Sequence, residues 1–438
     1  MGSVFIFLGL LIFCAHLFAA IFSRQRIPDV LLLLGIGIVV GPVLHWVSPD
    51  ELSTIGSAFA SITLLFILFD SGVDISIDAI RRYWKGMVEV TLLSFVLSWG
   101  ATMLVATLAL GMEWSAAALL GTIVSGTAAA IVIPLVRQMK ASERTRTVLT
   151  LESALSGVLC IVLTLCLLDG MRMGSLSAGQ MIGKVLASLL MATIIGVIGG
   201  IVWAGLLERV RKIQNSMFLT PAFVFVIYGL ADALGYSGPI AALAFGIVLG
   251  NTNYFEVSFL KKMRLGDMRP LVAEEKSFFK EIVFVLKTFF FVYIGICMPF
   301  YDMQSLLYGL AVAAAIAVVR FVLVEIVGRK NTRTDRIVVG IMCPKGLVSA
   351  ILASMPEQIN ESMGYNVIPG ATTIKYTAYS VIFFSIIITS LLVLCTRRSL
   401  IAPSQPETPE PPEPPESPEL PEKPEPPELP EQPEPPAN

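Results

Sequence analysis

The sequence predicts an all-α polytopic membrane protein of about 13 transmembrane helices, in two inverted six-helix repeats with broken helices 5 and 12. Three observations support this prediction. The 438 residues are 55% hydrophobic and only 15% charged, and apolar runs repeatedly reach the ~20 residues that a bilayer requires. Two of these runs contain helix-breaking residues. A pair of similar glycine-containing segments recurs in the two halves of the chain.

The apolar runs and the basic residues between them predict the topology. Alternate connections carry most of the lysine and arginine, which places the N-terminus outside and the C-terminus in the cytoplasm of a multi-pass cell-membrane protein. The predicted spans cover residues 4–22, 30–47, 53–70, 87–110, 115–138, 147–168, 180–206, 217–234, 237–251, 277–299, 304–328, 336–356 and 374–396.

An internal repeat is visible in the second and ninth predicted spans. Gly37-Ile-Val-Val-Gly41 follows Pro28, and Gly246-Ile-Val-Leu-Gly250 follows Pro239. Six spans, one linking span and six further spans give the two halves opposite orientations, which is typical of secondary transporters. Alternatively, the Gly-x-x-x-Gly pattern only permits close helix contact.

The repeat predicts that a break in the fifth span has a counterpart in the twelfth. Ser125-Gly126-Thr127 interrupts the fifth, where glycine weakens a helix and hydroxyls satisfy freed backbone groups. Cys343-Pro344-Lys345-Gly346 interrupts the twelfth, although Pro344 alone would also kink a helix. Two facing breaks supply helix dipole ends and free carbonyls for an ion.

The sixth span carries an intramembrane carboxylate. Glu152, Ser153 and Ser156 share one helical face because residues three and four apart are neighbours on a helix. A carboxylate in hydrocarbon costs at least ~2.5 kcal/mol and is expected to face a partner or a water-filled cavity. The sequence therefore predicts an ion site between the fifth and sixth spans.

Several segments together resemble the sodium/proton exchanger superfamily of monovalent cation:proton antiporters, over essentially residues 4–396. The resemblance implies a mobile core with crossed broken helices, a homodimer, and alternating access that exchanges Na⁺ or K⁺ for protons. The segments are Ile27-Pro-Asp-Val-Leu-Leu-Leu-Leu-Gly35, Leu64-Leu-Phe-Ile-Leu-Phe-Asp70-Ser-Gly72, Leu151-Glu-Ser-Ala-Leu-Ser-Gly157, Ser237-Gly-Pro-Ile-Ala-Ala-Leu-Ala-Phe-Gly246 and Pro344-Lys-Gly-Leu347.

The sequence departs from that family at two positions of the ion site. The family's broken fifth helix usually reads Thr-Asp-Pro, and its sixth carries Asn-Asp or Asp-Asp. Here Ala128 and Gly157 stand at the two aspartate positions, and neither can titrate. Two alternatives to antiport therefore stay open, a non-transporting or regulatory relative and an uncoupled cation pathway.

The resemblance also implies roles for individual residues. Asp70 matches an acidic position that lines the ion site in some members, or else is a helix-end carboxylate. Glu152 matches an acid that pairs with an arginine on the eleventh helix, where Arg320 lies, and we expect a structural ion pair. Thr127, Ser153 and Ser156 offer hydroxyl oxygens to an alkali cation, or bond to their own helix backbone.

Two lysines lie inside predicted spans, Lys287 and Lys345. We hypothesise that one of them carries the proton while Asp70 retains cation affinity; otherwise both are structural. Beyond the transported alkali cation, the sequence predicts no metal, cofactor, nucleic-acid partner or enzymatic site. Its partners are expected to be the cation, the proton, the lipid bilayer and a second copy of the chain.

The composition changes after residue 400, which predicts two domains, a transmembrane domain over 1–400 and a disordered tail over 401–438. In the tail, glutamate recurs at every third residue from Glu407 to Glu434. Polyproline II has three residues per turn, so these side chains would form one acidic stripe on a stiff spacer. The stripe either contacts a basic surface or is simply solvated.

Overall fold

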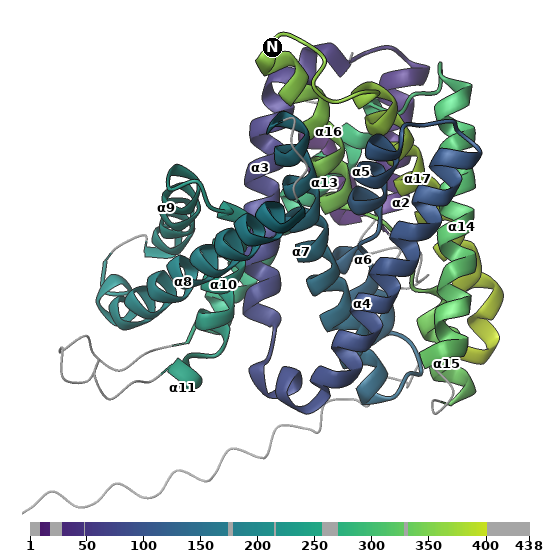
Figure 1. The fold of residues 1–438 in the computed structure, drawn as a ribbon. Helices are drawn as coiled ribbons and strands as arrows, with labels where there is room; N and C mark the ends of the chain where they lie inside the picture. Colours follow the sequence, from purple (N-terminus) through teal and green to yellow (C-terminus); the bar gives the residue numbers. More distant parts are fainter. Residues whose placement is uncertain are drawn as a thin grey trace, which may run out of the picture. The chain divides into compact units, whose positions relative to one another are not determined.

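The computed structural model describes residues 9–17, 29–47, 49–173, 178–213, 216–255, 270–327 and 332–400. All of them belong to one unit, Met1–Ile401. Within them the chain is folded into helices joined by turns and short connections (Figure 1). The predicted disordered tail, 401–438, lies outside the described residues.

In the first half of the chain, the fifth predicted span is divided by a break into two helices, α5 (Trp114–Val124) and α6 (Ala129–Arg137). Residues 9–17 are helical, and α2 (Asp29–Ile38) continues as a π-helical turn, η1 (Val39–Val43), which contains Pro42. The following helices are α3 (Pro49–Asp74), α4 (Ile77–Leu108), α5 (Trp114–Val124), α6 (Ala129–Arg137) and α7 (Glu143–Met173).

The second half contains the other marked break, between α15 and α16. The elements are α8 (Ala178–Val210), the 3₁₀ turn η2 (Ser216–Phe218), α9 (Leu219–Ala233), α10 (Gly238–Gly250), the short α11 (Thr252–Phe255), α13 (Ala273–Ile296), α14 (Met303–Val327), α15 (Arg333–Ile341), α16 (Leu347–Met363) and α17 (Ala371–Leu400).

Several of these helices are long and apolar enough to cross a membrane. Seven such stretches occur in the described residues, together with the shorter apolar stretches Val30–Val43 and Gly238–Gly250. The described residues thus show the predicted helical elements, with several helices apolar enough for a membrane, whereas the count of 13 and the repeats remain predictions. The helix α4 begins at Ile77, before the start of the fourth predicted span at residue 87, because the hydroxyl of Ser76 caps it by accepting from the N–H of Ala79.

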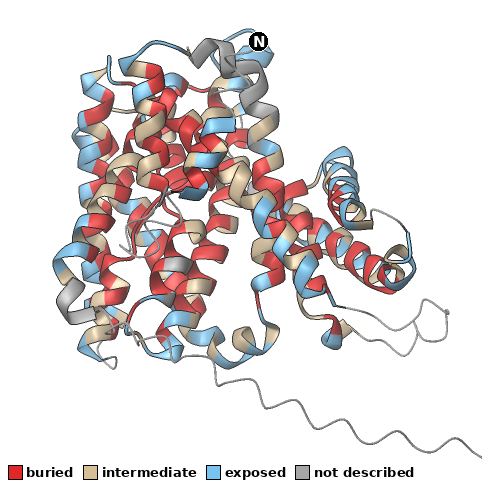
Figure 2. Ribbon diagram, turned by 180° about the vertical axis from the view of Figure 1, so that it is seen from behind, coloured by how far each residue is buried: buried red, intermediate tan, exposed pale blue. Residues whose placement is uncertain are grey.

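Two hydrophobic clusters organise the helices on either side of α3. One cluster joins α3 to α8, α9 and α10, and the other fills the space among α2, α4 to α7 and α13 to α17. In Figure 1, α8, α9 and α10 accordingly lie to one side of α3. Figure 2 shows the buried residues concentrated where helices face one another.

Glycines allow two helix pairs to pack with their backbones in close contact. In the α2–α13 pair, a Cβ on Gly37 would lie 2.1 Å from the carbonyl oxygen of Val292. In the α3–α10 pair, a Cβ on Gly246 would lie 2.3 Å from the carbonyl oxygen of Phe69. The predicted Gly-x-x-x-Gly segments therefore make close helix contacts, each with a different partner helix.

We expect Gly246→Ala to destabilise the protein by about 1–3 kcal/mol, because the added methyl group forces α3 and α10 apart. Thermal unfolding of the purified protein in detergent measures this as a lower midpoint. Gly229→Ala in α9 is the matched control, since nothing lies within 4 Å of its added Cβ. Equal midpoints for the two variants would contradict the close packing.

Candidate functional site

The two predicted breaks meet in the interior of the protein. The first separates α5 from α6 at residues 125–128, and the second separates α15 from α16 at residues 342–346. In an 18-residue apolar window of Trp114–Ile133, 83% of the residues are buried, compared with 39% in the corresponding windows of α4 and α14. The predicted breaks are confirmed, and the first lies in the most buried of these apolar stretches.

The backbone groups freed at the first break find partners on other elements. The N–H of Ala128 donates to the carbonyl oxygen of Pro344 at 2.8 Å, which links the breaks directly. On α7, the hydroxyl of Ser156 accepts from the N–H of Thr127 at 3.1 Å, and the sulfur of Cys160 accepts from the N–H of Gly126 at 3.0 Å. The interruption therefore leaves these three donors satisfied, as burial requires.

The second break is held in a comparable way. The N–H of Lys345 donates to the hydroxyl of Ser385 on α17 at 2.9 Å, and its side-chain nitrogen donates to the carbonyl oxygen of Ser125 at 3.1 Å. A Cβ on Gly346 would lie 2.6 Å from the Cβ of Ala128. The approach of the two breaks therefore requires glycine at position 346.

Glu152 and Arg320 form a fully buried ion pair beside the crossing. The two guanidinium nitrogens of Arg320 donate to the two carboxylate oxygens of Glu152, at 2.5 and 2.7 Å. Arg320 also donates to the hydroxyl of Ser94 on α4 and to the carbonyl oxygen of Val339 on α15. One arginine on α14 thus ties together α4, α7 and α15.

A small cavity of about 40 Å³ lies at the crossing. Since one water molecule needs roughly 10–15 Å³, the cavity has room for a few water molecules or ions of similar size. None of the described residues that line it is an aspartate or glutamate. They are Ile67, Leu68, Ser71, Gly126, Thr127, Ala128, Ala129, Ala130, Ser153, Ala154, Gly157, Cys160, Gly346, Leu347, Val348 and Ser349.

The structure brings most of the predicted ion-site residues together. Thr127 and Ser153 line the cavity, and the hydroxyl of Ser156 lies 3.2 Å from that of Thr127. Asp70 does not line it, but the next residue, Ser71, does.

The two predicted lysines have different surroundings. Lys345 lies at the crossing, as described above. Lys287 lies on α13, where its nitrogen is 5.6 Å from the ring centre of Phe284.

Sequence reasoning missed four polar residues of the site, Ser71, Cys160, Ser349 and Ser385. Cys160 follows Ser156 by four residues, so the helical period of α7 already placed it on the same face. Ser349 lies in the first turn after the predicted break. For Ser71 and Ser385, no local signal distinguishes them from other serines in apolar helices.

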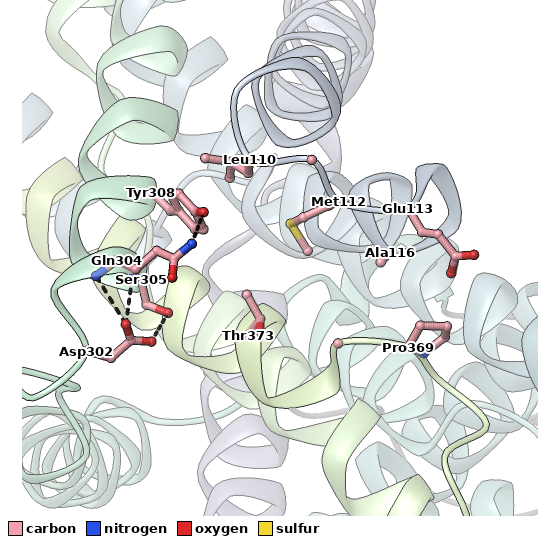
Figure 3. A pocket seen from close by; sticks show the side chains of 12 residues that line it. Leu110, Met112, Glu113, Ala116, Asp302, Gln304, Ser305, Tyr308, Pro369 and Thr373 are labelled. Atoms are coloured by element: carbon pink, nitrogen blue, oxygen red, sulfur yellow. Dashed lines mark hydrogen bonds between the residues drawn. The ribbon is translucent and has the colours of Figure 1, made fainter.

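A larger cavity of about 410 Å³ lies away from the crossing, where the turns before α5, α14 and α17 meet. Figure 3 shows that Glu113 does not point toward Asp302 across it. Asp302 instead accepts hydrogen bonds from the hydroxyl of Ser305 and from the N–H groups of Ser305 and Gln304. These bonds, first that of the Ser305 hydroxyl, lower the pKa of Asp302. Asp302 therefore caps α14 in its charged form.

A family model described as "Sodium/hydrogen exchanger, transmembrane" matches residues 9–394. The chain belongs to the sodium/hydrogen exchanger family. It is therefore a membrane transporter and not an enzyme. The match covers every element of the crossing described above.

The relatives that resemble this exchanger are named for two different cations, Na⁺ and K⁺. "Na(+)/H(+) antiporter 1" of Methanocaldococcus jannaschii is 24% identical over 79% of this chain and 82% of its own length. "K(+)/H(+) antiporter NhaP2" of a Shewanella species is 24% identical over 57% of this chain and 44% of its own length.

Solved structures support the fold of the exchanger. The sodium proton antiporter MjNhaP1 of M. jannaschii at pH 8 superposes with a TM-score of 0.69 at 21% identity, over 88% of this chain and 98% of that one. A second structure of MjNhaP1, from electron microscopy, gives a TM-score of 0.72 at 20% identity, over 93% of this chain and 100% of that one.

Glu152→Gln is expected to destabilise the exchanger by about 3–5 kcal/mol, because it leaves the buried guanidinium of Arg320 without a counter-charge. The thermal unfolding midpoint and the monodisperse yield in detergent are the measurements. Glu325→Gln removes the exposed ion pair with Arg336 and should change stability by at most about 1 kcal/mol.

A double variant, Glu152→Leu with Arg320→Met, removes both charges together. It should regain most of the stability lost in Glu152→Gln, because no unpaired charge remains buried. If Glu152→Gln unfolded at the wild-type temperature, the ion pair would not have the structural role proposed for it.

Proposed function

We propose that the chain exchanges a monovalent cation, Na⁺ or K⁺, for protons across a membrane by alternating access. Membership of the sodium/hydrogen exchanger family supports antiport. The relatives differ in the cation that their names give, Na⁺ in M. jannaschii and K⁺ in Shewanella. Both ions are therefore substrates to be tested.

The observation that supports this function best is the buried crossing of two broken helices around a cavity. Such breaks are tolerated in hydrocarbon only where the backbone is buried in protein or lines a cavity. The cavity at this crossing is lined by residues of both breaks and of α7. It has the position that a transported ion occupies in transporters built from broken helices.

We assign the cation ligands to oxygen atoms around this cavity. Thr127 and Ser153 line it, and Ser156 lies within hydrogen-bond distance of Thr127. Alkali cations are hard and prefer such hydroxyl and carbonyl oxygens. Asp70 precedes a lining residue, Ser71, and we propose that its carboxylate attracts the cation on the approach to the cavity.

Lys345 is the group that we propose to carry the proton. Its ammonium is buried and bonds to the carbonyl oxygen of Ser125 at the first break. A cation in the neighbouring cavity would repel this charge and favour loss of the proton. One cation would then replace one proton. Lys287, on α13, is the alternative proton carrier from the sequence.

Paired contacts support the proposed inverted repeat. The repeat relates α2 to α10 and α3 to α13, so the contact between α2 and α13 corresponds to that between α10 and α3. It also relates α7 to α17. Ser156 on α7 and Ser385 on α17 each accept from a backbone N–H of the adjoining break.

The positive-inside pattern supports an orientation with the N-terminus outside and the C-terminus in the cytoplasm. We further propose a homodimer, as the family resemblance implies. The acidic segment after residue 400 would then be cytoplasmic.

The purified protein in liposomes with a trapped pH dye should dissipate an imposed pH gradient when Na⁺ or K⁺ is added outside. Because Ala128 and Gly157 offer the cavity no carboxylate, an uncoupled pathway is the second candidate. It would give cation flux without proton movement. Absence of both fluxes in a folded protein would indicate a non-transporting relative.

Lys345→Gln should abolish cation-driven proton movement, because the side chain can no longer exchange a proton. Lys287→Gln is the matched control and should retain coupled exchange. The same liposome assay, combined with radioactive Na⁺ or K⁺ uptake, separates loss of coupling from loss of cation flux. Coupled exchange retained in Lys345→Gln but lost in Lys287→Gln would transfer the proton role to Lys287.

A further inference from the structure

The cavity at the crossing is surrounded by the positive ends of two helices. The first residues of α6, Ala129 and Ala130, line it together with the first residues of α16, Leu347 to Ser349. The backbone N–H groups of these five residues have no hydrogen-bond acceptor in the part of the chain that the structure describes. Free N–H groups and the helix dipole make such ends favourable for negative charge.

A buried hydroxyl provides a second, independent indication of a ligand. Ser349 lines the cavity and is only 3% exposed. Within the described residues its hydroxyl makes no hydrogen bond, unlike that of Ser354 in the same helix, which donates to the carbonyl oxygen of Ile351 at 2.8 Å. A buried polar group normally has a partner, so a ligand or water in the cavity is expected to supply one.

The charges at the crossing do not balance. The carboxylate of Glu152 is occupied by both guanidinium nitrogens of Arg320, so this pair is neutral. Lys345 is 1% exposed and forms no ion pair with a carboxylate of the described residues. A buried charge normally requires a partner of opposite sign.

We propose that this cavity binds a small monovalent inorganic anion, chloride, between the first turns of α6 and α16. Its ligands would be the free N–H groups of both turns and the hydroxyl of Ser349. A monatomic halide is close to water in size, and the cavity of about 40 Å³ exceeds the roughly 10–15 Å³ that one water needs.

The role of the anion rests on the proposed antiport function. A bound chloride balances one positive charge, which is either the proton on Lys345 or the alkali cation beside the hydroxyls of Thr127 and Ser153. The anion thus supplies the negative charge that no lining side chain provides. Cation exchange should then depend on chloride.

Equilibrium binding of radioactive chloride to the purified wild-type protein tests the site without transport. Gly157→Asp places a carboxylate in the cavity, and its Cβ meets only Val348 at an ordinary 3.6 Å. This fixed negative charge should weaken chloride binding by about tenfold or more. Gly157→Asn adds a side chain of nearly the same size without the charge, so the difference in chloride binding between the two variants measures the effect of the charge alone.

A second pair of variants tests the ligands. Ser349→Ala should weaken chloride binding by about tenfold, since it removes one hydrogen bond to a charged ligand. Ser354→Ala is the matched control on α16 and should bind chloride as the wild type does. Thermal unfolding profiles establish that each variant is folded.

Transport in liposomes containing either chloride or gluconate completes the test. The wild type should exchange cations for protons only with chloride, and Gly157→Asp should do so with either anion. A folded wild type that exchanges ions but binds no chloride would overturn the anion site and leave antiport intact; the cavity would then hold water only. Chloride binding by Gly157→Asp as tight as that by the wild type would also overturn it.

Chloride binding without cation exchange in either anion would instead overturn the antiport proposal. The chloride site would stand in that case, because binding and its loss in Gly157→Asp are measured without transport. The two proposals therefore fail by different observations.

Discussion

The hydrogen bond from the N–H of Ala128 to the carbonyl oxygen of Pro344 joins the two interrupted helices, and the site depends on it. An interruption frees backbone groups that hydrocarbon cannot satisfy. Each break therefore needs hydrogen-bond partners within the protein. Here Pro344 of the second break accepts from the first, and Ser125 of the first break accepts from the side chain of Lys345 in the second. Ser156 and Ser385 satisfy two further N–H groups. Gly346 permits the approach, because any Cβ there would collide with Ala128.

This arrangement also decides the electrostatics of the site. Holding the breaks together places the first turns of α6 and α16 at one cavity, so two positive helix ends face the same space. Lys345 adds a buried positive charge when it is protonated, while Glu152 is neutralised by Arg320. With Ala128 and Gly157 in the lining, no side chain that lines the cavity supplies negative charge. The proposed anion and the proposed release of the proton from Lys345 are both argued from this excess of positive charge.

Much of the fold was predictable because the bilayer restricts what a chain can do. The breaks were predicted because glycine, proline and hydroxyl residues oppose a continuous helix, and the structure has both. The contact between Glu152 and Arg320 was expected because neither charge is tolerable alone in hydrocarbon. The start of α4 could not be predicted from hydropathy, since hydropathy follows apolar residues whereas the helix begins at its cap, Ser76.

The sequence by itself determined the class of protein, the positions of the two breaks and the absence of carboxylates at positions 128 and 157. Only the tertiary structure decided which side chains line the cavity. Successive helical residues differ by roughly 100° in direction, so Ser71 lines it and Asp70 does not. The rotation of α3 is set by its packing against α10 and α13, which are far away in sequence. For the same reason Ser349 and Ser385 acquire their surroundings only when the two halves of the chain meet.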